Sequence, residues 1–466
     1  MAEIQTIDVS RLIDERNINR FNILVVLLCF FATLFDGYDI TAAAFAGPAI
    51  IKQWGLTNMA AFGPVLSASL FGIFFGSAFF GYIADSWGRR IAILSALCTV
   101  GGFSLVSMWA GGPTSLAVLR FFAGIGIGGL LPTTIALNAE FAPARVRATM
   151  IILMFTGVTF GGAIPGPVAA WLMPSYGWQV LFLIGGVFPL LAAIAVALWL
   201  PESIKFLVLE TDRRADIVKI IAALNPELAI TSETKFVIPE EKPVAFTPKL
   251  LFSGGLAWLT VLLWILFICN QLAFYFVNQW TPTVLTAANL PMSHAAIIAS
   301  LFQLGGTVGG LVLMRPTDKY GVIPVCVLFV LSLFTATTIG YARQPETLLM
   351  LDVFLAGFAL LGLQFGLNAI SGMMYPTAFR SSGSGWALSV SRFGAISGPI
   401  IGGILIARQM SIEHLYMFLM IPLVIGTICS FIFAGLYFRR FQSIALSRQG
   451  KSAAPTATAP AAPRAG

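Results

Sequence analysis

Charged residues are scarce in this chain. Asp, Glu, Lys and Arg make up 10% of the 466 residues, whereas 58% of the residues are hydrophobic. Soluble globular domains average roughly 25% charged residues. A chain so poor in charge cannot cover its surface with groups that water solvates, so we expect most of that surface to face lipid. The mean hydropathy of +0.89 indicates the same environment.

Metal ligands and nucleophiles are also scarce. The two histidines, His294 and His414, are isolated, and the five cysteines lie singly in apolar runs without a CxxC pair. This pattern predicts neither a disulfide nor a metal site. The glycine-rich run at 124–129 is not followed by Gly-Lys-Ser/Thr, so no phosphate loop is expected. Without a nucleophile–base pair, metal cluster or nucleotide loop, the chain is not expected to be an enzyme.

Long apolar runs are what the sequence does contain. Spanning a hydrocarbon core of about 30 Å takes about 20 apolar residues in a helix. Such runs cover residues 21–47, 60–84, 91–110, 114–139, 148–172, 178–200, 255–281, 293–314, 322–341, 346–371, 383–406 and 413–438. An open sheet would leave backbone groups unsatisfied in lipid, and a β-barrel would show alternating strands. We therefore expect an all-α membrane protein with twelve transmembrane helices.

Lys and Arg are distributed unevenly between the two sides of these helices. If the N-terminus is inside, the cytoplasmic segments hold 22 of the 27 Lys and Arg. The outer loops hold Lys52, Arg343 and Arg408, while Arg120 and Arg392 lie within helices. Cytoplasmic loops are enriched in Lys and Arg, so both termini are expected to be cytoplasmic. The net charge of +7 does not predict nucleic-acid binding, because no basic patch alternates with stacking aromatics.

The longest polar stretch, at 201–250, divides the predicted helices into two groups of six. The expected organisation is a cytoplasmic segment at 1–20, a six-helix bundle at 21–200, a cytoplasmic linker at 201–250, a second six-helix bundle at 251–440 and a disordered cytoplasmic tail at 441–466. The tail is rich in Ala, Pro and Thr and has nothing to bury.

The two groups of helices also share a sequence repeat. Asp85 recurs as Asp318 and Pro143 recurs as Pro376, and both pairs are 233 residues apart. One offset shared by two separate loops indicates duplicated, pseudo-symmetric bundles. Carriers built from such repeats hold their substrate between the halves, near the middle of the membrane.

Two acidic residues, Asp36 and Asp39, lie in the first apolar run. A spacing of three residues puts both carboxylates on one face of a helix. Ionisable groups at membrane depth are costly and normally serve ion, proton or substrate binding. We interpret the pair as a candidate proton-coupling site; a structural ion pair, or a position at the outer water interface, is the alternative.

Two arginines also lie inside predicted spans. A rise of 1.5 Å per residue places Arg120 at about the depth of Asp36, so an Asp–Arg contact is possible. That contact would be either permanent or broken by protonation or substrate. Arg392 lies near the midplane, where its guanidinium could hold a carboxylate bidentately. Pairing of Arg392 with Asp352 or a backbone carbonyl is the alternative.

Amide and aromatic side chains gather in the second half of the chain. They are Asn270, Gln271, Asn278, Gln279, Trp280, Gln303, Gln364, Asn368, Trp386 and Phe393. Amides in apolar helices often only join helices, and Trp side chains can belong to an interfacial belt. Besides Arg120 and Arg392, the substrate contacts that we predict are Tyr38, Gln271, Trp280, Gln303, Gln364, Asn368 and Trp386.

The segment at 81–90 reads Gly-Tyr-Ile-Ala-Asp-Ser-Trp-Gly-Arg-Arg, which predicts a cytoplasmic turn that acts as a conformational latch. The latch residues would be Gly81, Asp85, Gly88, Arg89 and Arg90, with Asp318 from the second copy. This segment resembles the loop 2–3 signature of the major facilitator superfamily. Residues 318–321 resemble its weaker second copy, which lacks the Arg pair.

Asp36-Gly-Tyr-Asp39 resembles the helix-one motif of the aromatic acid:H⁺ symporters, a bacterial branch of that superfamily. Tyr375-Pro-Thr-Ala-Phe-Arg380, with Trp386, Arg392 and Gly398-Pro399 after it, is similar to the same branch. The resemblance covers essentially all twelve predicted helices. It implies roles in transport for the two helix-one aspartates and for Arg120 and Arg392.

The resemblance implies a secondary transporter that takes up aromatic carboxylates with protons by alternating access. It further implies a monomer in the lipid of the bacterial inner membrane, with no cofactor beyond the coupling proton and no nucleic-acid partner. A related carrier for another organic anion or for a sugar is the alternative. Arg392 near the midplane favours an anion over a neutral sugar.

Overall fold

The computed structural model describes residues 6–441, except 16, 57–58, 144, 210–212, 225–233, 238–247, 254, 342–344 and 376–379. The tail predicted to be disordered lies outside these described residues, apart from Phe441 at the end of the last helix.

Long helices make up most of the described chain. The first half contains α2 (Arg20–Gln53), η1 (Met59–Phe62), α3 (Gly63–Trp87), α4 (Arg89–Val106), η2 (Ser107–Trp109), α5 (Pro113–Phe141), α6 (Arg147–Ala163), α7 (Pro165–Tyr176) and α8 (Gln179–Trp199). The second half contains α11 (Ala257–Ala287), α12 (Met292–Tyr320), α13 (Ile323–Thr338), α14 (Glu346–Met374), α15 (Arg380–Ala407), α16 (Ile412–Met417) and α17 (Met420–Phe441). Between them lie α9 (Ile204–Leu209), α10 (Arg214–Leu224) and η4 (Pro248–Phe252).

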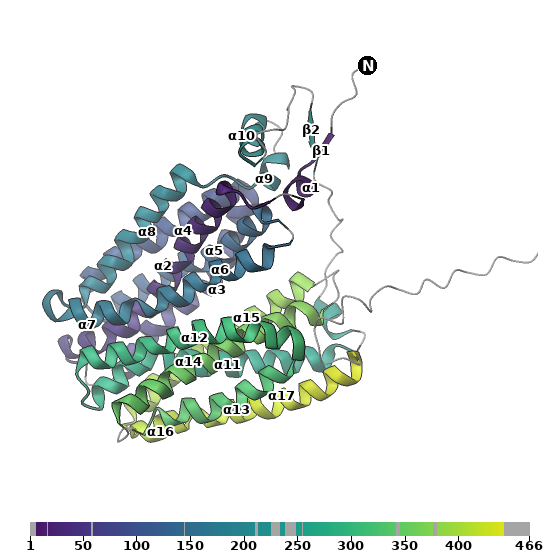
Figure 1. Ribbon diagram of the computed structural model, residues 1–466. Helices are drawn as coiled ribbons and strands as arrows, with labels where there is room; N and C mark the ends of the chain where they lie inside the picture. The colour runs from purple at the N-terminus through teal and green to yellow at the C-terminus, as the bar shows by residue number, and fades with distance from the viewer. Residues whose placement is uncertain are drawn as a thin grey trace, which may run out of the picture.

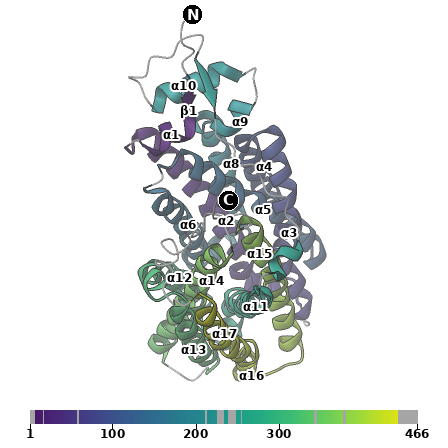
Figure 2. The same ribbon diagram turned by 90° about the vertical axis from the view of Figure 1, so that its right-hand side faces the viewer.

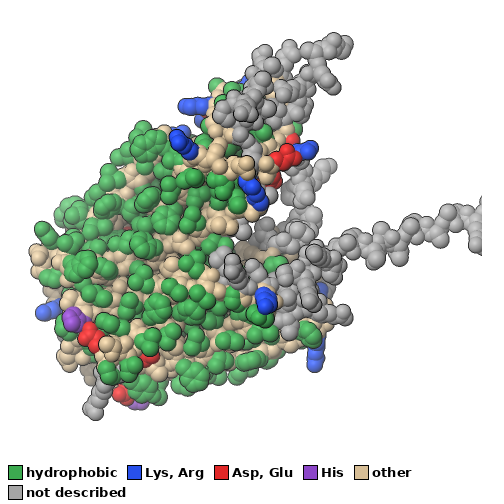
Figure 3. All heavy atoms as spheres, in the orientation of Figure 1, with side chains coloured by type: hydrophobic (Ala, Val, Ile, Leu, Met, Phe, Trp, Pro, Cys, Tyr) green, Lys and Arg blue, Asp and Glu red, His purple; other side chains and the backbone are tan. Residues whose placement is uncertain are grey.

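Within the described residues, eleven helical segments are long and apolar enough to cross a membrane. The segment at Ile323–Thr338, which is α13, is apolar but shorter. Hydrophobic side chains cover the flanks of the molecule, while Lys and Arg gather mainly at one end (Figure 3). These features confirm the predicted all-α membrane fold with twelve apolar segments.

The helices form two bundles with the same internal packing (Figure 1). In the N-terminal bundle, α2 to α8, α3 packs on α5 and α2 packs on α6. In the C-terminal bundle, α11 to α17, the corresponding pairs are α12 with α14 and α11 with α15. The repeated pairing is the structural counterpart of the sequence repeat.

A small cap covers one end of the N-terminal bundle. It consists of α9, α10, α1 (Val9–Asp14) and a parallel two-stranded sheet of β1 (Thr6–Asp8) and β2 (Lys235–Val237). Figure 2 places it above the N-terminal bundle and far from α13 and α17. Asp14 pairs with Arg147 at 2.6 Å, and Val9 and Ile13 are buried in one core cluster with Phe141 and Val196 of the first bundle. The sequence did not predict this sheet.

The two bundles contact each other away from the cap. Three hydrogen bonds join them among the described residues: Gln279 Nε2 donates to Ile40 O (3.2 Å), Ser67 Oγ donates to Ile396 O (3.1 Å), and Thr307 Oγ1 donates to Thr159 Oγ1 (2.7 Å). The packing of η1 on α15 and of α7 on α12 continues this contact toward the end opposite the cap. That end of the molecule is therefore closed between the bundles.

Close approach of α2 and α6 depends on glycine. A Cβ built on Gly37 would lie 1.8 Å from the carbonyl oxygen of Val158, a distance that no real contact allows. Gly37→Ala must therefore separate the two helices, at a cost of about 1–3 kcal/mol for overpacking. We expect a lower Tm for the purified variant in detergent.

Gly102→Ala is the matched control, because a Cβ at Gly102 meets nothing within 4 Å. Alanine is favoured over glycine inside a helix by roughly 0.5–1 kcal/mol, so this variant should melt at or above the wild-type temperature. Equal Tm values for the two variants would contradict the close packing of α2 on α6.

Candidate functional site

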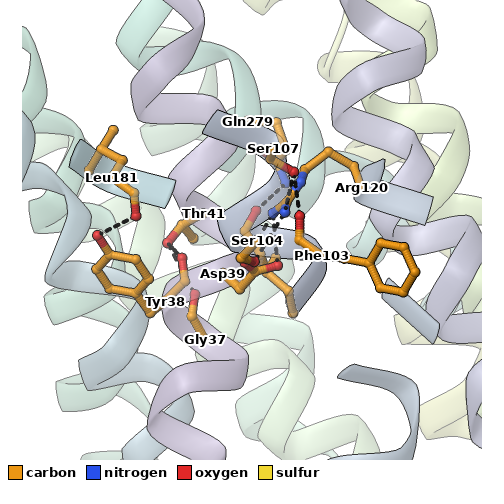
Figure 4. A network of polar contacts seen from close by, with 11 residues as sticks. Gly37, Tyr38, Asp39, Thr41, Phe103, Ser104, Ser107, Arg120, Leu181 and Gln279 are labelled. Atoms are coloured by element: carbon orange, nitrogen blue, oxygen red, sulfur yellow. Dashed lines mark hydrogen bonds and ion pairs between the residues drawn. The ribbon is translucent and has the colours of Figure 1, made fainter. Parts of the chain in front are cut away.

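The two aspartates of α2 are only three positions apart, but they face different neighbours. At 3.6 residues per turn, their side chains point about 60° apart around the helix. Asp39 points toward Ser104 and Arg120 of the N-terminal bundle (Figure 4). Asp36 lies one turn before Ile40, whose carbonyl accepts a hydrogen bond from α11 of the other bundle. The prediction of one shared carboxylate face is therefore only approximately right.

Asp39 is held in an ion pair inside the N-terminal bundle. Nη1 of Arg120 lies 3.0 Å from each carboxylate oxygen of Asp39. Nη2 of the same guanidinium donates to Ser104 Oγ at 3.0 Å and to Ser107 Oγ at 2.9 Å, and Ser104 donates in turn to Asp39. The predicted Asp–Arg contact is thus present, and its partner is Asp39.

The pair is sealed from solvent. Arg120 is 0% exposed, and its guanidinium carbon lies 4.8 Å from the ring centroid of Phe182 on α8. Two charges at this burial are tolerated because they neutralise each other and share hydrogen bonds. The network ties α2, α4, η2, α5 and α8 into one body.

Asp36 has no such partner. The residue is 0% exposed, and neither carboxylate oxygen has a hydrogen-bond partner. Burying an ionised carboxylate without a partner is very costly.

Arg392 of α15 supplies the positive charge on the other side of the interface. It is half-buried, forms no salt bridge with a described carboxylate, and lies within electrostatic range of Asp36 and Tyr275. The alternative pairing with Asp352 is not formed. At 1.5 Å per residue, Arg392 lies about 18 Å along α15 from its start, near the middle of the bundle.

A chain of amides lies at a similar level in the C-terminal bundle. Asn270 Nδ2 donates to Gln364 Oε1 at 3.1 Å, and Gln364 Nε2 donates to Asn368 Oδ1 at 3.3 Å. Gln364 and Asn368 are half-buried, so they keep some access. Their polar groups could hold hydroxyl groups of a ligand near Arg392.

Other predicted contacts are engaged within the protein. Tyr38 donates to Leu181 O at 3.0 Å and points toward Leu181 of α8 (Figure 4). Trp280 is fully buried and donates to Pro399 O at 2.9 Å. Trp386 stacks on Trp264 with ring centroids 6.3 Å apart.

Two predicted glutamines lie at the boundary between the bundles or close to it. Gln303 donates to Asn278 Oδ1 at 3.0 Å and lies against Gly162 of the N-terminal bundle. Gln271 is buried on α11. In this conformation neither joins the amide chain of Asn270, Gln364 and Asn368.

The segment at 81–90, which the sequence predicts to be a turn acting as a latch, is mostly helical. Helix α3 continues to Trp87, so the turn is confined to Gly88, whose φ of 104° is a conformation that favours glycine. Gly81 is inside the helix and Asp85 is exposed. The helix continues through this segment because none of the residues at 81–87 terminates a helix. The side chain of Asp318 lies outside the described ones.

Arg89 and Arg90 bind acidic residues that the sequence analysis did not single out. Arg89 pairs with Glu140 and donates to Ser203 Oγ at 2.9 Å. The backbone N–H of Arg90 donates to Glu202 Oε1 at 3.1 Å. The signal in the sequence that could have singled out Glu140 is an acidic residue at the end of an apolar run. Among the described residues, no group of three or more His, Cys, Asp or Glu could hold a metal ion.

Comparisons with known proteins agree with this architecture. The sequence profile of the Major Facilitator Superfamily matches residues 29–338. The chain is 33% identical to the 4-hydroxybenzoate transporter PcaK of Acinetobacter baylyi, over 92% of this chain and 94% of that protein. It is 37% identical to a gallate transporter of Pseudomonas putida, over 89% of this chain and 92% of that protein.

Solved structures resemble the fold at lower identity. A D-xylose-proton symporter superposes with a TM-score of 0.66 at 16% identity, covering 88% of this chain and 97% of that chain. At this identity the likeness concerns the fold alone.

The buried pair generates a stability prediction. Arg120→Met leaves Asp39 buried without its counter-charge, and breaking one partner of a buried pair costs about 3–5 kcal/mol. Asp39→Val should be destabilising by a similar amount, whereas the double variant should melt above both single variants because no charge is left unpaired. Thermal unfolding in detergent measures all three.

Glu15→Gln is the control, since it removes the exposed pair between Arg11 and Glu15 and should change the Tm little. If either single variant at Asp39 or Arg120 melted like the wild type, the pair could not be the anchor described above.

Proposed function

The chain belongs to the major facilitator superfamily, in the group that includes the 4-hydroxybenzoate and gallate transporters, and from this premise we propose that it carries aromatic carboxylates together with protons. Transport would proceed by alternating access, as uptake across the bacterial inner membrane. The proposed coupling ion is the proton, and no other cofactor is needed.

The observation that carries this proposal is Arg392. A half-buried guanidinium near the middle of the bundle, without a salt bridge to a described carboxylate, is costly unless an anion binds to it. Guanidinium groups bind carboxylates bidentately. The relatives named above, with a benzoate transport protein at 31% identity, are named for carriage of aromatic acids.

The amide chain next to this level supports hydroxylated rings as cargo. Gln364 and Asn368 are half-buried and carry both donors and acceptors. A site built to hydrogen-bond a hydroxyl group rejects analogues that lack it. Arg392 would therefore hold the carboxylate, and the amides would hold ring hydroxyl groups.

Charge distribution supports an orientation. The cap end carries Lys205, Arg213 and Arg214, and α17 ends there with Arg439 and Arg440. By the positive-inside rule, the cap and both termini would lie in the cytoplasm. The closed contact between the bundles would then face outward, and the structure would correspond to the state that releases cargo inside.

Asp36 is the proposed proton carrier. Asp39 is committed to Arg120, whereas the carboxyl group of Asp36 has no hydrogen-bond partner and lies at the boundary between the bundles. Movement of one bundle against the other would change its surroundings and with them its affinity for a proton.

The proposal predicts the behaviour of the purified carrier in proteoliposomes. With an inward proton gradient, we expect accumulation of radiolabelled 4-hydroxybenzoate above its equilibrium level, and a protonophore should abolish the accumulation. Excess unlabelled gallate or benzoate should compete, whereas D-xylose should not.

Arg392→Met is the companion variant and should lose accumulation, because it removes the charge that holds the carboxylate. The control is Asp352→Asn, which changes a half-buried charged residue of the same bundle. This variant should accumulate cargo as the wild type does. Competition by D-xylose without competition by aromatic acids would instead favour a sugar carrier.

A further inference from the structure

Helix α11 presents one face to its own bundle and another to α2 of the N-terminal bundle, on which it packs. Thr281 and Trp280 lie on the face toward their own bundle. Thr281 Oγ1 donates to Val277 O at 2.6 Å and lies 2.9 Å from the hydroxyl oxygen of Tyr416, and Trp280 donates to Pro399 O at 2.9 Å. These polar groups are therefore bonded inside the C-terminal bundle.

The face of α11 toward the N-terminal bundle carries polar atoms that are not bonded. Gln279 donates to Ile40 O, but its own Oε1 has no hydrogen-bond partner. Asn278 accepts from Gln303, but its Nδ2 has no partner. The hydroxyl of Thr283, about one turn beyond Gln279, has none either. Asn278, Gln279 and Thr283 are 6%, 1% and 4% exposed, so all three are buried.

The backbone of the N-terminal bundle comes close to this face at two glycines. A Cβ built on Gly47 of α2 would lie 3.2 Å from Oγ1 of Thr283. A Cβ built on Gly162 of α6 would lie 2.9 Å from Cδ of Gln303, the residue that donates to Asn278. The unbonded atoms are therefore sealed from water while the two bundles touch here.

A buried polar atom without a partner is costly, because it gives up its hydrogen bonds to water and gains none in return. A threonine in a helix can avoid this cost by donating to the carbonyl four residues before it. Thr286 of α11 does so, with Pro282 O at 2.8 Å, whereas Thr283 does not. The costs of the three residues act in the same direction, since parting of the bundles would let water bond all of them.

We propose that the closed end opposite the cap is a metastable closure, whose reopening is favoured by the unbonded polar atoms of Asn278, Gln279 and Thr283. In the orientation proposed above, this end faces outward. The closure would therefore return the empty carrier toward the state that accepts cargo from outside, without the help of a ligand. The inference goes beyond the proposed function, because it concerns the empty protein whatever its cargo.

The test measures the distance across the closed end with a pair of spin labels. Lys52, in the last turn of α2, and Arg408, just beyond α15, are exposed and belong to opposite bundles. The labels are attached to Lys52→Cys and Arg408→Cys in the purified full-length protein, with Cys98→Ser and Cys429→Ser, since the other three cysteines are buried. Without cargo, we expect a short distance for the closed end and a second, longer distance for the open end.

Two variants that each remove one hydroxyl should shift these populations in opposite directions. Thr283→Val removes an unbonded hydroxyl and keeps the shape, so the ratio of open to closed protein should fall about fivefold or more. Ser67→Ala removes the hydroxyl that donates to Ile396 O across the contact between the bundles, so the ratio should rise. If loss of polarity alone decided the outcome, both variants would shift toward closure.

Thr281→Val is the control on the other face of α11. Its hydroxyl is bonded within the C-terminal bundle, so the variant should have a lower Tm and an unchanged ratio of open to closed protein. An unchanged ratio in Thr283→Val, or a shift in the same direction as in Ser67→Ala, would overturn the proposal.

The wild type provides a second decision that needs no hydroxyl variant. A single short distance would show that the closure is not metastable and would overturn the proposal, even if Thr283→Val did not fold. Two distances would support it. Because the experiment contains no cargo, its failure would leave the carriage of aromatic acids standing, and failure of the carrier to transport aromatic acids would leave the measured distances unaffected.

Discussion

The ion pair between Asp39 and Arg120 is the interaction on which the rest of the N-terminal bundle depends. Removing two charges from water costs several kcal/mol each, and their attraction offsets this only when the geometry is good and the remaining donors are satisfied. Here two serines take the second guanidinium nitrogen and Phe182 covers the cation. The helices that supply these groups cannot move apart without exposing an unpaired charge, so the bundle behaves as one body.

Because Arg120 binds Asp39, the two aspartates of α2 lie in different environments. Both terminal nitrogens of Arg120 bind Asp39 and the two serines, and neither carboxylate oxygen of Asp36 accepts a hydrogen bond. Arg392, which belongs to the other bundle, lies within electrostatic range of Asp36. One helix thus carries an aspartate that holds its own bundle together and another whose environment depends on where the second bundle stands.

The sequence predicted the spans well because the membrane imposes a local rule. Each run must be apolar over about 20 residues, and such a run can be recognised in the sequence without knowing which helices pack on one another. Even α13, the shortest of the twelve segments, was visible as a run at 322–341. The strands β1 and β2 were not predicted, because each has three residues and they pair across more than two hundred positions. A contact at that separation leaves no periodicity in either segment.

The candidate site was predicted less completely than the spans, because its geometry depends on differences of a few ångströms and on the direction of each side chain. Depth estimates from helix rise brought Arg120 level with the aspartates, but three residues differ by only about 4.5 Å along the axis, which could not decide between Asp36 and Asp39. The direction of side chains mattered more than depth. Trp280 and Tyr38 were aromatic residues at suitable levels, yet both turn toward backbone carbonyls of their own bundle. Tyr275 gave no signal in a run already rich in aromatics.

The strength of the bonds differs within and between the bundles, and this difference is what an alternating carrier requires. Inside the N-terminal bundle lie a buried ion pair and glycine contacts so close that a methyl group would not fit. Between the bundles, the described residues contribute three hydrogen bonds from neutral groups, of the kind that water can replace at little cost. A moving interface that contained a permanent buried salt bridge would have to break it in every cycle. Among the described residues, Asp36 and Arg392 lie in opposite bundles and form no salt bridge, so this interface contains no such bond to break.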